Sequence, residues 1–599
     1  MNKTLMALAL TVCTSATVFG QVSKRTGNED TLRTVVPTVF RYKPTISDAK
    51  KLREQPRPIE TDVTKPQPQY ELMARPLQVV YVPDSIRPAK MKGEPLDPLY
   101  KGYIKAGIGN GINYLGDLYF NSGRSRSGEI GFESHNYGTQ GVIVGVPPAP
   151  YLRSTTSFYG KHFFKRHALS GIAYYDAERL QYYGYDDSNP FYFGITQTDP
   201  FRQVYHRAGG QVEYQSFFTD SSQLNYTASL KIDRFQDASN ANSDFWLRPR
   251  VRFSKFIAEH KGILDLSGDL NFIQYPDSFT SVFFKTVPDR VSSHIITIAP
   301  QMRSTFGKFG LAYGFNAQAL ITSGGVKPRL YPNIHARYNL LSEVIIPYLS
   351  ITGGLQRNNL NTLAATNPFI WPSLALLRNT DRVLHLSGGF RGSISRSLTY
   401  NLSAGRYTDR DVPLFVNYNA SSYNPGLNRF GENYFTVIYD TIQTTEISGE
   451  LTYNVQEKIE VVASGTFRSF KTTREVKAWQ LPSVEARLSA FYQLQHKIIV
   501  KADFMVYGPR YAKSLAAYNP GVDNADDTEF INGTPYAVRA ITLKTIADIN
   551  LGVEYRYTER LSAFLNINNL IAQRYAYWNQ YPVQRINILA GLTYSFARQ

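Results

Sequence analysis

The stretch Arg585-Ile-Asn-Ile-Leu-Ala-Gly-Leu-Thr-Tyr-Ser-Phe596 has an apolar residue at every second position. Small or polar residues fill most of the positions between them, so the pattern has a period of two. That period is typical of a β-strand, because successive side chains of a strand point to opposite faces. A span of about 11 residues is also the length of a tilted strand that crosses a bilayer. The stretch predicts either such a membrane strand or the edge strand of a soluble β-sandwich.

The composition of the chain favours the membrane strand. Its 599 residues include 42 Tyr and 35 Phe, yet its mean hydropathy is −0.30. Soluble proteins seldom carry so many aromatic side chains, and helical membrane proteins are far more apolar. Strands that turn one face to lipid and the other to water give this mixture, with aromatic residues gathered at the membrane interfaces. The length suits a single barrel domain as well as several smaller domains.

Alternation of the same kind recurs from Tyr100 to the end of the chain. It is clear at residues 264–272, 459–467 and 484–494, where the charged side chains fall on one face of each predicted strand. An Arg or Lys at the middle of a bilayer costs about 2–4 kcal/mol, so a lipid-facing strand requires its charges to lie on the other face. These segments therefore predict membrane strands with an apolar outer face and a polar inner face.

Short polar turns punctuate this region, and longer connections lie between them. Ten such turns imply eleven up-and-down strand pairs, which is an all-β, antiparallel transmembrane barrel of about 22 strands. The predicted turns lie near residues 122–124, 165–166, 220–222, 259–260, 307–308, 342–343, 395–396, 456–458, 495–497 and 558–560. The longest loops are predicted at residues 179–203, 359–380, 408–434 and 509–540. Their aromatic residues either contact a ligand or hold the loops together.

The N-terminus has the pattern of an export signal. Residues 1–20 carry Lys3, an apolar run over residues 5–12 and small residues before Gln21. The run is too short to cross a bilayer as a helix. Cys13 is an alternative site for a lipid anchor, although the residues before it match that signal poorly. It is the only cysteine, so a disulfide within the chain is excluded.

Residues 21–98 differ from everything that follows, because they hold 11 of the 32 prolines and few sustained apolar patterns. Residues 46–54 suit one short helix, and residues 77–82 suit a short extended piece. The isolated apolar patches are too small for a core, but they suit strand addition to the sheet edge of another protein. We expect an extended periplasmic segment that binds a partner or enters the barrel. A disordered leader is the alternative.

The last predicted strand carries Gly591, Tyr594 and Phe596, and it is preceded by Asn569, Leu570, Tyr575, Pro582 and Arg585. This end of the chain resembles the end of a TonB-dependent receptor. In that family an Asn-Leu stretch after the penultimate strand is followed by a Tyr, a Gly- or Pro-bearing loop, an Arg and a final strand that ends in aromatics. The matching positions are Asn569, Leu570, Tyr575, Pro582 and Arg585, followed by the barrel-closing signal of Gly591, Tyr594 and Phe596. The resemblance implies a 22-stranded outer-membrane barrel that binds or transports a nutrient.

A stretch near the N-terminus resembles the energy-coupling box of the same family. That box is an acidic residue or Thr followed by apolar residues. The matching positions are Asp30, Thr31, Leu32, Val35 and Val36. Strings of this kind are common by chance. The resemblance implies a contact with TonB.

One part of the family pattern has no counterpart in the sequence. The barrel of a TonB-dependent receptor is filled by a compact N-terminal plug, and residues 21–98 are too short and too rich in proline for that domain. We therefore expect a plugless relative of the family. A lumen of this size leaks if it is empty. Inward-folding loops, the N-terminal segment and another protein are the candidates for filling it.

Catalytic, metal-binding and cofactor-binding patterns are not apparent in the sequence. The nine His residues are scattered, and the glycines of residues 107–111 lie in a hairpin rather than before a helix. The sequence predicts no enzyme and no cofactor. The formal charge of +17 suggests anionic partners, but nothing resembles a nucleic-acid-binding module. Four basic residues predicted on the inner face either attract anionic solutes or balance acidic residues of the lumen: Arg468, Arg487, Lys501 and Arg556.

The predicted domains are a signal peptide (1–20), a proline-rich segment without a plug (21–98) and an outer-membrane barrel (99–599). We expect a receptor or transport component for an unidentified nutrient in the outer membrane of a Gram-negative bacterium. A structural or assembly subunit of an outer-membrane complex is the alternative, and a passive porin-like channel is a lesser one. Expected partners are outer-membrane lipid and lipopolysaccharide, the barrel assembly machinery, and a surface lipoprotein or periplasmic protein that contacts residues 21–98.

Overall fold

The computed structural model describes most of the predicted barrel. The described residues are 100–598, except for 124, 145, 147, 184–201, 221, 277–289, 372–376, 418–433, 456–457, 496, 518–527 and 532–533. The predicted signal peptide, the proline-rich segment and the coupling-box resemblance lie outside these residues. They remain predictions from the sequence.

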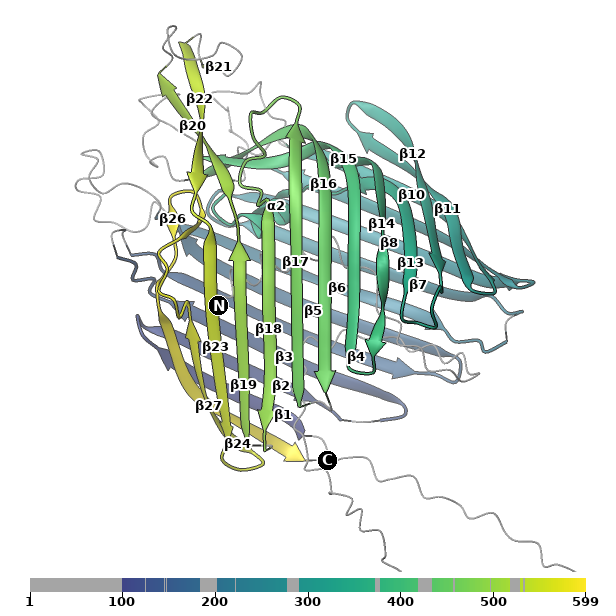
Figure 1. Cartoon of the computed structure of the whole chain (residues 1–599), viewed down its shortest axis with the longest axis horizontal. Helices are drawn as coiled ribbons and strands as arrows, with labels where there is room; N and C mark the ends of the chain where they lie inside the picture. Colours follow the sequence, from purple (N-terminus) through teal and green to yellow (C-terminus); the bar gives the residue numbers. More distant parts are fainter. Residues whose placement is uncertain are drawn as a thin grey trace, which may run out of the picture.

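Twenty-two antiparallel strands form one closed barrel, which confirms the predicted fold (Figure 1). Neighbours in the wall are neighbours in the chain, apart from short extra strands inserted between β19 and β23 and between β24 and β27. The wall strands are β1 (Tyr100–Gly109), β2 (Asn113–Asn121), β3 (Gly128–Thr139), β4 (Tyr151–Phe163), β5 (His167–Gln181), β6 (Arg202–Ser216), β7 (Asn225–Asp237), β8 (Asn242–Ile257), β9 (His260–Gln274), β10 (Arg290–Phe306), β11 (Phe309–Thr322), β12 (Gly325–Tyr338), β13 (Ile346–Gln356), β14 (Thr380–Ser395), β15 (Leu398–Asn417), β16 (Phe435–Val455), β17 (Ile459–Thr472), β18 (Val484–Leu494), β19 (Ile498–Tyr507), β23 (Ile546–Arg556), β24 (Leu561–Asn568) and β27 (Asn587–Arg598).

The last strand closes the barrel. β27 pairs with β24 on one side and with β1 on the other. In the β1 ladder, Gly591 lies opposite Gly107 and Leu592 lies opposite Ala106. A side chain does not fit at Gly591, because its Cβ atom would lie 2.6 Å from the Gly107 Cα atom and would overlap the Ala106 carbonyl oxygen. Closure leaves the wall without the unpaired strand edges that promote aggregation.

The two ends of the barrel differ in their connections. β1 begins and β27 ends at the same end, which we call the turn end, and all ten predicted turns are confirmed there. The opposite end, the loop end, holds the long connections. The hairpin predicted at residues 107–111 is confirmed, because only residues 110–112 connect β1 to β2. Two other loop-end connections, at residues 238–241 and 323–324, are shorter than predicted. The prediction of a longer connection between successive turns was wrong at these two tight hairpins.

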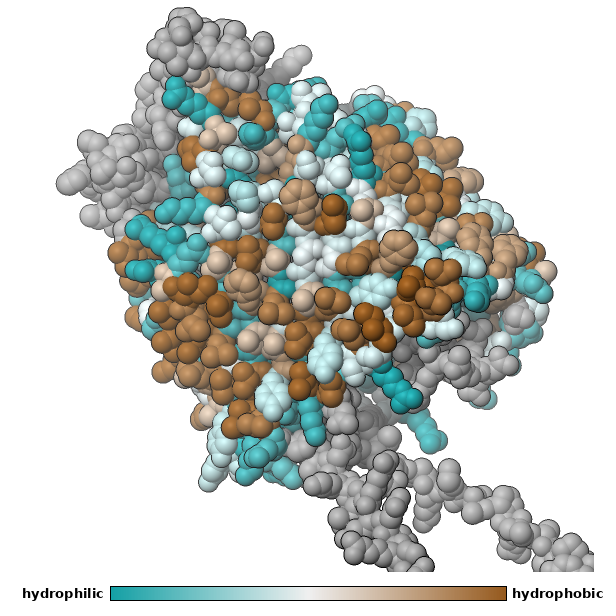
Figure 2. Space-filling view, in the orientation of Figure 1, coloured by the Kyte–Doolittle hydropathy of each residue, from teal (hydrophilic) through white to brown (hydrophobic). Residues whose placement is uncertain are grey.

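The faces of the strands alternate as predicted. In β27, Ile588 and Leu592 are 41% and 57% exposed on the outside, whereas Leu589 and Thr593 are buried on the inside. The segments predicted to face lipid on β9, β17 and β18 also turn their apolar side chains outward. On β9, for example, Leu270 lies opposite Leu247 of β8, which also faces outward. Figure 2 shows hydrophobic residues spread over the visible outer wall, with hydrophilic residues gathered toward its two ends. Among the described residues, no helix is long and apolar enough to cross a membrane.

Two predicted loops contain more β-structure than expected. β15 and β16 run past the expected boundaries, so their connection covers residues 418–434 instead of 408–434. The region 509–540 was predicted to be a loop but contains a three-stranded sheet. Its strands are β20 (Arg510–Ala517), β21 (Thr528–Ile531) and β22 (Thr534–Leu543). In both places adjacent strands continue to satisfy each other's backbone hydrogen bonds beyond the barrel wall, which irregular loops do not.

Candidate ligand site at the loop end

Two loop-end segments pack against each other over the lumen. The lid loop, residues 357–371, contains the helix α2 (Leu360–Thr366), which lies within the outline of the barrel in Figure 1. The lid hairpin, residues 575–583, contains β25 (Ala576–Trp578) and β26 (Tyr581–Pro582). Buried side chains of both segments join one aromatic-rich core with side chains of β5, β6, β7, β9, β15, β16 and β23. Because these strands come from opposite parts of the wall, the lid spans the mouth.

The short helix of the lid loop follows from its local sequence. Asn359 caps its N-terminus in a capping box, with the Asn359 side chain accepting from the Thr362 backbone N–H at 2.8 Å. Leu360, Leu363 and Ala364 have the i, i+3, i+4 spacing of one helix face, and all three are buried in the core of the lid. The cap begins the helix at the point where its apolar face meets the wall.

Contacts on two sides of the barrel hold the lid loop. From β6, Arg207 donates to the Asn361 side chain at 3.1 Å, and the Tyr205 hydroxyl donates to the Ile370 carbonyl at 3.2 Å. On the other side, Ile370 forms a parallel bridge with Phe435 of β16. β6 and β16 are ten strands apart in the wall order. The lid loop therefore bridges the lumen rather than covering one edge of it.

Stacked aromatic rings join the lid loop to the lid hairpin. The rings of Phe369 and Tyr581 stack with their centroids 3.7 Å apart, and the Tyr183 ring meets Tyr581 edge-on at 4.9 Å. The Tyr183 hydroxyl donates to the Pro582 carbonyl at 3.0 Å. Burial raises the pKa of both Tyr183 and Tyr581, so their hydroxyl groups stay neutral and keep their protons. Each aromatic ring pair of this kind adds about 0.5–1.5 kcal/mol of stability beyond the contribution of the area it buries.

A buried arginine of the small three-stranded sheet holds the lid hairpin. Arg510 of β20 is 1% exposed, and its guanidinium donates to the carbonyl oxygens of Tyr577 and, at 2.9 Å, of Ala576. The same guanidinium lies 4.9 Å from the centre of the Tyr507 ring. Backbone carbonyls and ring faces thus stabilise this charge, which has no salt bridge within the described part of the chain.

The C-terminal motif residues build the connection that carries the lid hairpin. Asn569 is buried at a φ of 51°, and its side-chain amide donates to two carbonyls of this connection at 2.9 and 3.2 Å. Tyr575 is buried and donates to the Asp548 carboxylate of β23 at 2.5 Å. Arg585 donates to a carbonyl of the same connection at 3.1 Å, whereas Leu570 is 44% exposed. Four of the five motif positions, Pro582 included, therefore fix the shape of the lid hairpin.

The barrel-closing residues lie outside the candidate site. Tyr594 is 46% exposed on the outer wall, and the Phe596 ring covers Gly102 of β1, where a Cβ atom would lie 2.6 Å from the ring. Gly591 faces inward at the seam with β1. These three positions join the last strand to the first and do not contact the lid.

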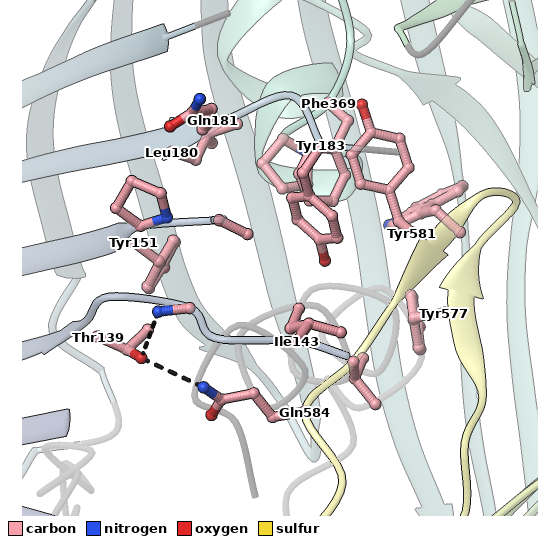
Figure 3. A pocket seen from close by; sticks show the side chains of 16 residues that line it. Thr139, Ile143, Tyr151, Leu180, Gln181, Tyr183, Phe369, Tyr577, Tyr581 and Gln584 are labelled. Atoms are coloured by element: carbon pink, nitrogen blue, oxygen red, sulfur yellow. Dashed lines mark hydrogen bonds between the residues drawn. The ribbon is translucent and has the colours of Figure 1, made fainter. Parts of the chain in front are cut away.

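An apolar pocket lies between the lid and the loop-end parts of β3, β4 and β5 (Figure 3). Its lining is mostly aromatic or aliphatic and includes Ile143, Tyr151, Leu180, Tyr183, Phe369, Tyr577, Trp578, Tyr581 and Val583. Thr139, Gln181 and Gln584 supply polar atoms at its edge. Among the described residues that line it, none is charged. Such a lining stacks on a flat, uncharged group and offers a few hydrogen bonds to orient it.

Below the lid, charges on the inner wall are paired across neighbouring strands. Arg468 donates to Glu446 at 2.8 Å and to Glu485 at 2.7 Å, and Arg487 donates to Asp503 at 2.7 Å. Of the two readings of these arginines, the structure confirms that they balance acidic residues of the lumen. Two more predicted positions, Lys501 and Arg556, lie on the inner faces of β19 and β23.

Loss of Arg468 is expected to destabilise the barrel. An Arg468→Gln variant leaves Glu446 and Glu485 facing each other across one strand, and we expect the free energy of unfolding to fall by about 1–3 kcal/mol. Urea-induced unfolding in lipid vesicles measures this change. A triple variant that also carries Glu446→Gln and Glu485→Gln should recover more than half of the loss. If the triple variant is as unstable as the single one, repulsion between the two carboxylates is not the cause.

Comparison with solved structures identifies the architecture. The barrel resembles the FrpB iron transporter from Neisseria meningitidis, with a TM-score of 0.62 and 11% identity over 84% of this chain and 83% of that one. It has the fold of outer-membrane receptors. The siderophore receptor PirA from Acinetobacter baumannii matches with a TM-score of 0.61 and 10% identity, over 84% and 81% of the two chains.

The pyoverdine outer-membrane receptor FpvA from Pseudomonas aeruginosa gives a TM-score of 0.57 and 13% identity, over 84% of this chain and 79% of that one. No protein-family model and no curated protein matches the sequence. At these identities the likeness establishes the fold and not the ligand. Within the described residues, no group of three or more His, Cys, Asp or Glu side chains is placed to hold a metal ion.

Sequence reasoning did not identify Phe369, Trp578 or Arg510 as parts of a site. A signal was present for the hairpin, because residues 575–581 contain four aromatic residues among seven. No local signal marks Phe369 or Arg510. Their roles depend on contacts with residues more than 60 positions away.

Proposed function

We propose that this chain is a receptor-like barrel in the outer membrane of a Gram-negative bacterium and takes up a nutrient through its loop end. The turn end then faces the periplasm, as short turns do in barrels of this kind. The observation that carries the proposal is the lid, which spans the mouth and has an apolar pocket at its edge. A closed mouth with a pocket suits selective capture of a ligand, whereas a passive porin requires an open channel.

The pocket supports a particular class of ligand. Its lining is uncharged and includes the rings of Tyr183, Phe369 and Tyr581. These residues favour a neutral molecule with a flat or apolar part, oriented by Thr139, Gln181 and Gln584. We do not propose iron or pyoverdine, which the similar structures are named for, as the ligand of this chain.

The outer wall supports contact with lipopolysaccharide. Arg234 and Arg406 are exposed, and their cross-strand partners Phe245 and Leu386 are apolar and also exposed. Arg234 lies in the loop-end half of β7, where a cation meets the headgroup region of the outer leaflet, whereas Arg406 lies near the middle of β15. The same proposal includes engagement of TonB and insertion by the barrel assembly machinery. It also includes a surface-lipoprotein or periplasmic partner for residues 21–98.

A comparison of three strains tests this function. A deletion strain, the same strain carrying the wild-type gene and one carrying Phe369→Ala with Tyr581→Ala are grown in complex medium, and the compounds they remove are compared by mass spectrometry. We expect the wild-type gene, but not the pocket variant, to restore depletion of one group of neutral compounds. Phe390→Ala is the matched control, because Phe390 is 53% exposed on the lipid face.

The result that contradicts this function is equal depletion in all strains. A structural or assembly subunit is then the better reading. That second candidate is favoured by one observation, the incompletely paired basic surface on the inner wall near the turn end described below. Co-purification of other envelope proteins in fixed stoichiometry would support it.

A further inference from the structure

One sector of the inner wall carries far more positive than negative charge. The basic wall consists of six side chains in the turn-end halves of β8, β9, β10, β12 and β14: Arg250, Arg252, Lys261, Arg303, Arg337 and Arg391. Each alternates with outward-facing residues of its strand, and Lys261 lies opposite Arg303 in the ladder. All six therefore face the lumen.

Counter-charge in this sector is scarce. Arg250 and Arg252 share a single carboxylate, Asp265 of β9. Lys261, Arg303, Arg337 and Arg391 have no salt bridge within the described residues. Elsewhere on the inner wall the typical cation has its own carboxylate, as Arg382 has Asp409 at 2.7 Å. The basic wall thus keeps about four positive charges free for a partner, because surface charges without a partner remain hydrated and available.

The middle of the basic wall is open. β11 runs between Arg303 and Arg337, and its inward residues at this level are Gly310 and Ala312. The Arg337 side chain lies over Gly310, where an added Cβ atom would come within 2.7 Å of its Nε atom. No bulky side chain of β11 separates the two arginines. A bound chain can therefore approach both.

The width of the basic wall indicates the size of its partner. β8 and β14 are six strand spacings apart, which is about 29 Å at roughly 4.8 Å per spacing. A phosphate-sized anion contacts only one or two of the cations. An extended polypeptide needs about nine residues to cross the same distance. The spacing favours an acidic peptide segment over a small anionic solute.

We propose that the basic wall binds an extended acidic segment of a separate periplasmic protein, which enters the lumen from the turn end. The lid blocks approach from the loop end. The chain's own N-terminal segment is a poor match, because residues 21–98 contain 14 Lys and Arg against 10 Asp and Glu. The proposal depends on the membrane orientation stated above and not on the transported ligand, so the two can fail separately.

Binding of a labelled peptide tests the proposal. The probe is a fluorescein-labelled peptide of ten glutamates, and the full-length protein in mild detergent is titrated while fluorescence anisotropy is recorded at low salt. We expect saturable binding that weakens about tenfold in a variant with Arg303→Gln, Arg337→Gln and Arg391→Gln, because several exposed charge pairs are lost together. A matched variant with Lys165→Gln, Arg396→Gln and Arg560→Gln loses the same charge from turn residues and should bind like wild type.

Four results would overturn the proposal. The first is no saturable binding, and the second is equal weakening in the two charge variants. The third is displacement of the peptide by inorganic phosphate beyond the effect of sodium chloride at equal ionic strength, which would indicate a small-anion site. The fourth is about tenfold tighter binding after deletion of residues 21–98, which would make that segment the natural occupant. Unchanged heat-modified migration of each variant in gel electrophoresis shows that its barrel is folded.

Discussion

Deletion of residues 592–599 is expected to abolish the folded barrel. Those residues include most of the β27 pairing with β1, from Leu592 opposite Ala106 to Arg598 opposite Tyr100. Without them β1 and β24 lose a partner, and their unpaired backbone groups face lipid, where each costs several kcal/mol. The exposed edges also promote aggregation. We expect the truncated chain to be degraded or to remain in the periplasm.

Membrane fractionation and heat-modified migration measure this outcome. A Gly591→Val variant should give the same result with the full length retained, because its side chain would collide with Gly107 and Ala106 across the seam. The control carries Tyr594→Phe and Phe596→Tyr, which keep aromatic rings on the outer face. Normal amounts of heat-modifiable barrel after the deletion would contradict the assignment of β27 as the closing strand.

Removal of the lid loop is expected to turn the closed barrel into a conducting one. Replacing residues 358–378 with a short Gly-Ser linker removes α2, Phe369 and the bridge to Phe435. The lid hairpin then loses its stacking partner, and the mouth of a wide 22-stranded barrel opens. We expect the conductance of single insertions in planar bilayers to rise at least about tenfold over wild type, as expected for a wide aqueous lumen.

A matched deletion separates the lid from other loop-end structure. Replacing residues 518–533 with a tight turn removes β21 but keeps β20 paired with β22. This variant should conduct like wild type. High conductance of the wild-type protein would show that the lid does not close the mouth. No rise after removal of the lid loop would show that the turn end is closed as well.

The membrane strands were predictable because a bilayer imposes a local rule. Most lipid-facing positions must be apolar and most charges must lie inside, so alternation in β9, β17, β18 and β27 is visible within about ten consecutive residues. The turns were predictable for a related reason. Turn-forming or polar residues such as Gly307 and Lys308 interrupt the alternation wherever the chain leaves the lipid.

The candidate site was only partly predictable. Inward-folding loops were one of three candidates for filling the lumen, and the C-terminal motif marked the connection that carries the lid hairpin. The lid loop and the small sheet were both read as irregular loops. Outside the bilayer no alternation is imposed on a segment, so a seven-residue helix such as α2 leaves little pattern in the sequence.

The sequence by itself determined the strand faces, the number of turns and the closing strand, because each depends on residues that are neighbours in the chain. Only the tertiary structure decided that Tyr183 donates to Pro582, 399 residues away, and that Phe369 stacks on Tyr581. It also decided that six cations from five strands share one sector of the lumen. Such sites depend on which strands closure brings together, and that arrangement arises only when β27 pairs with β1.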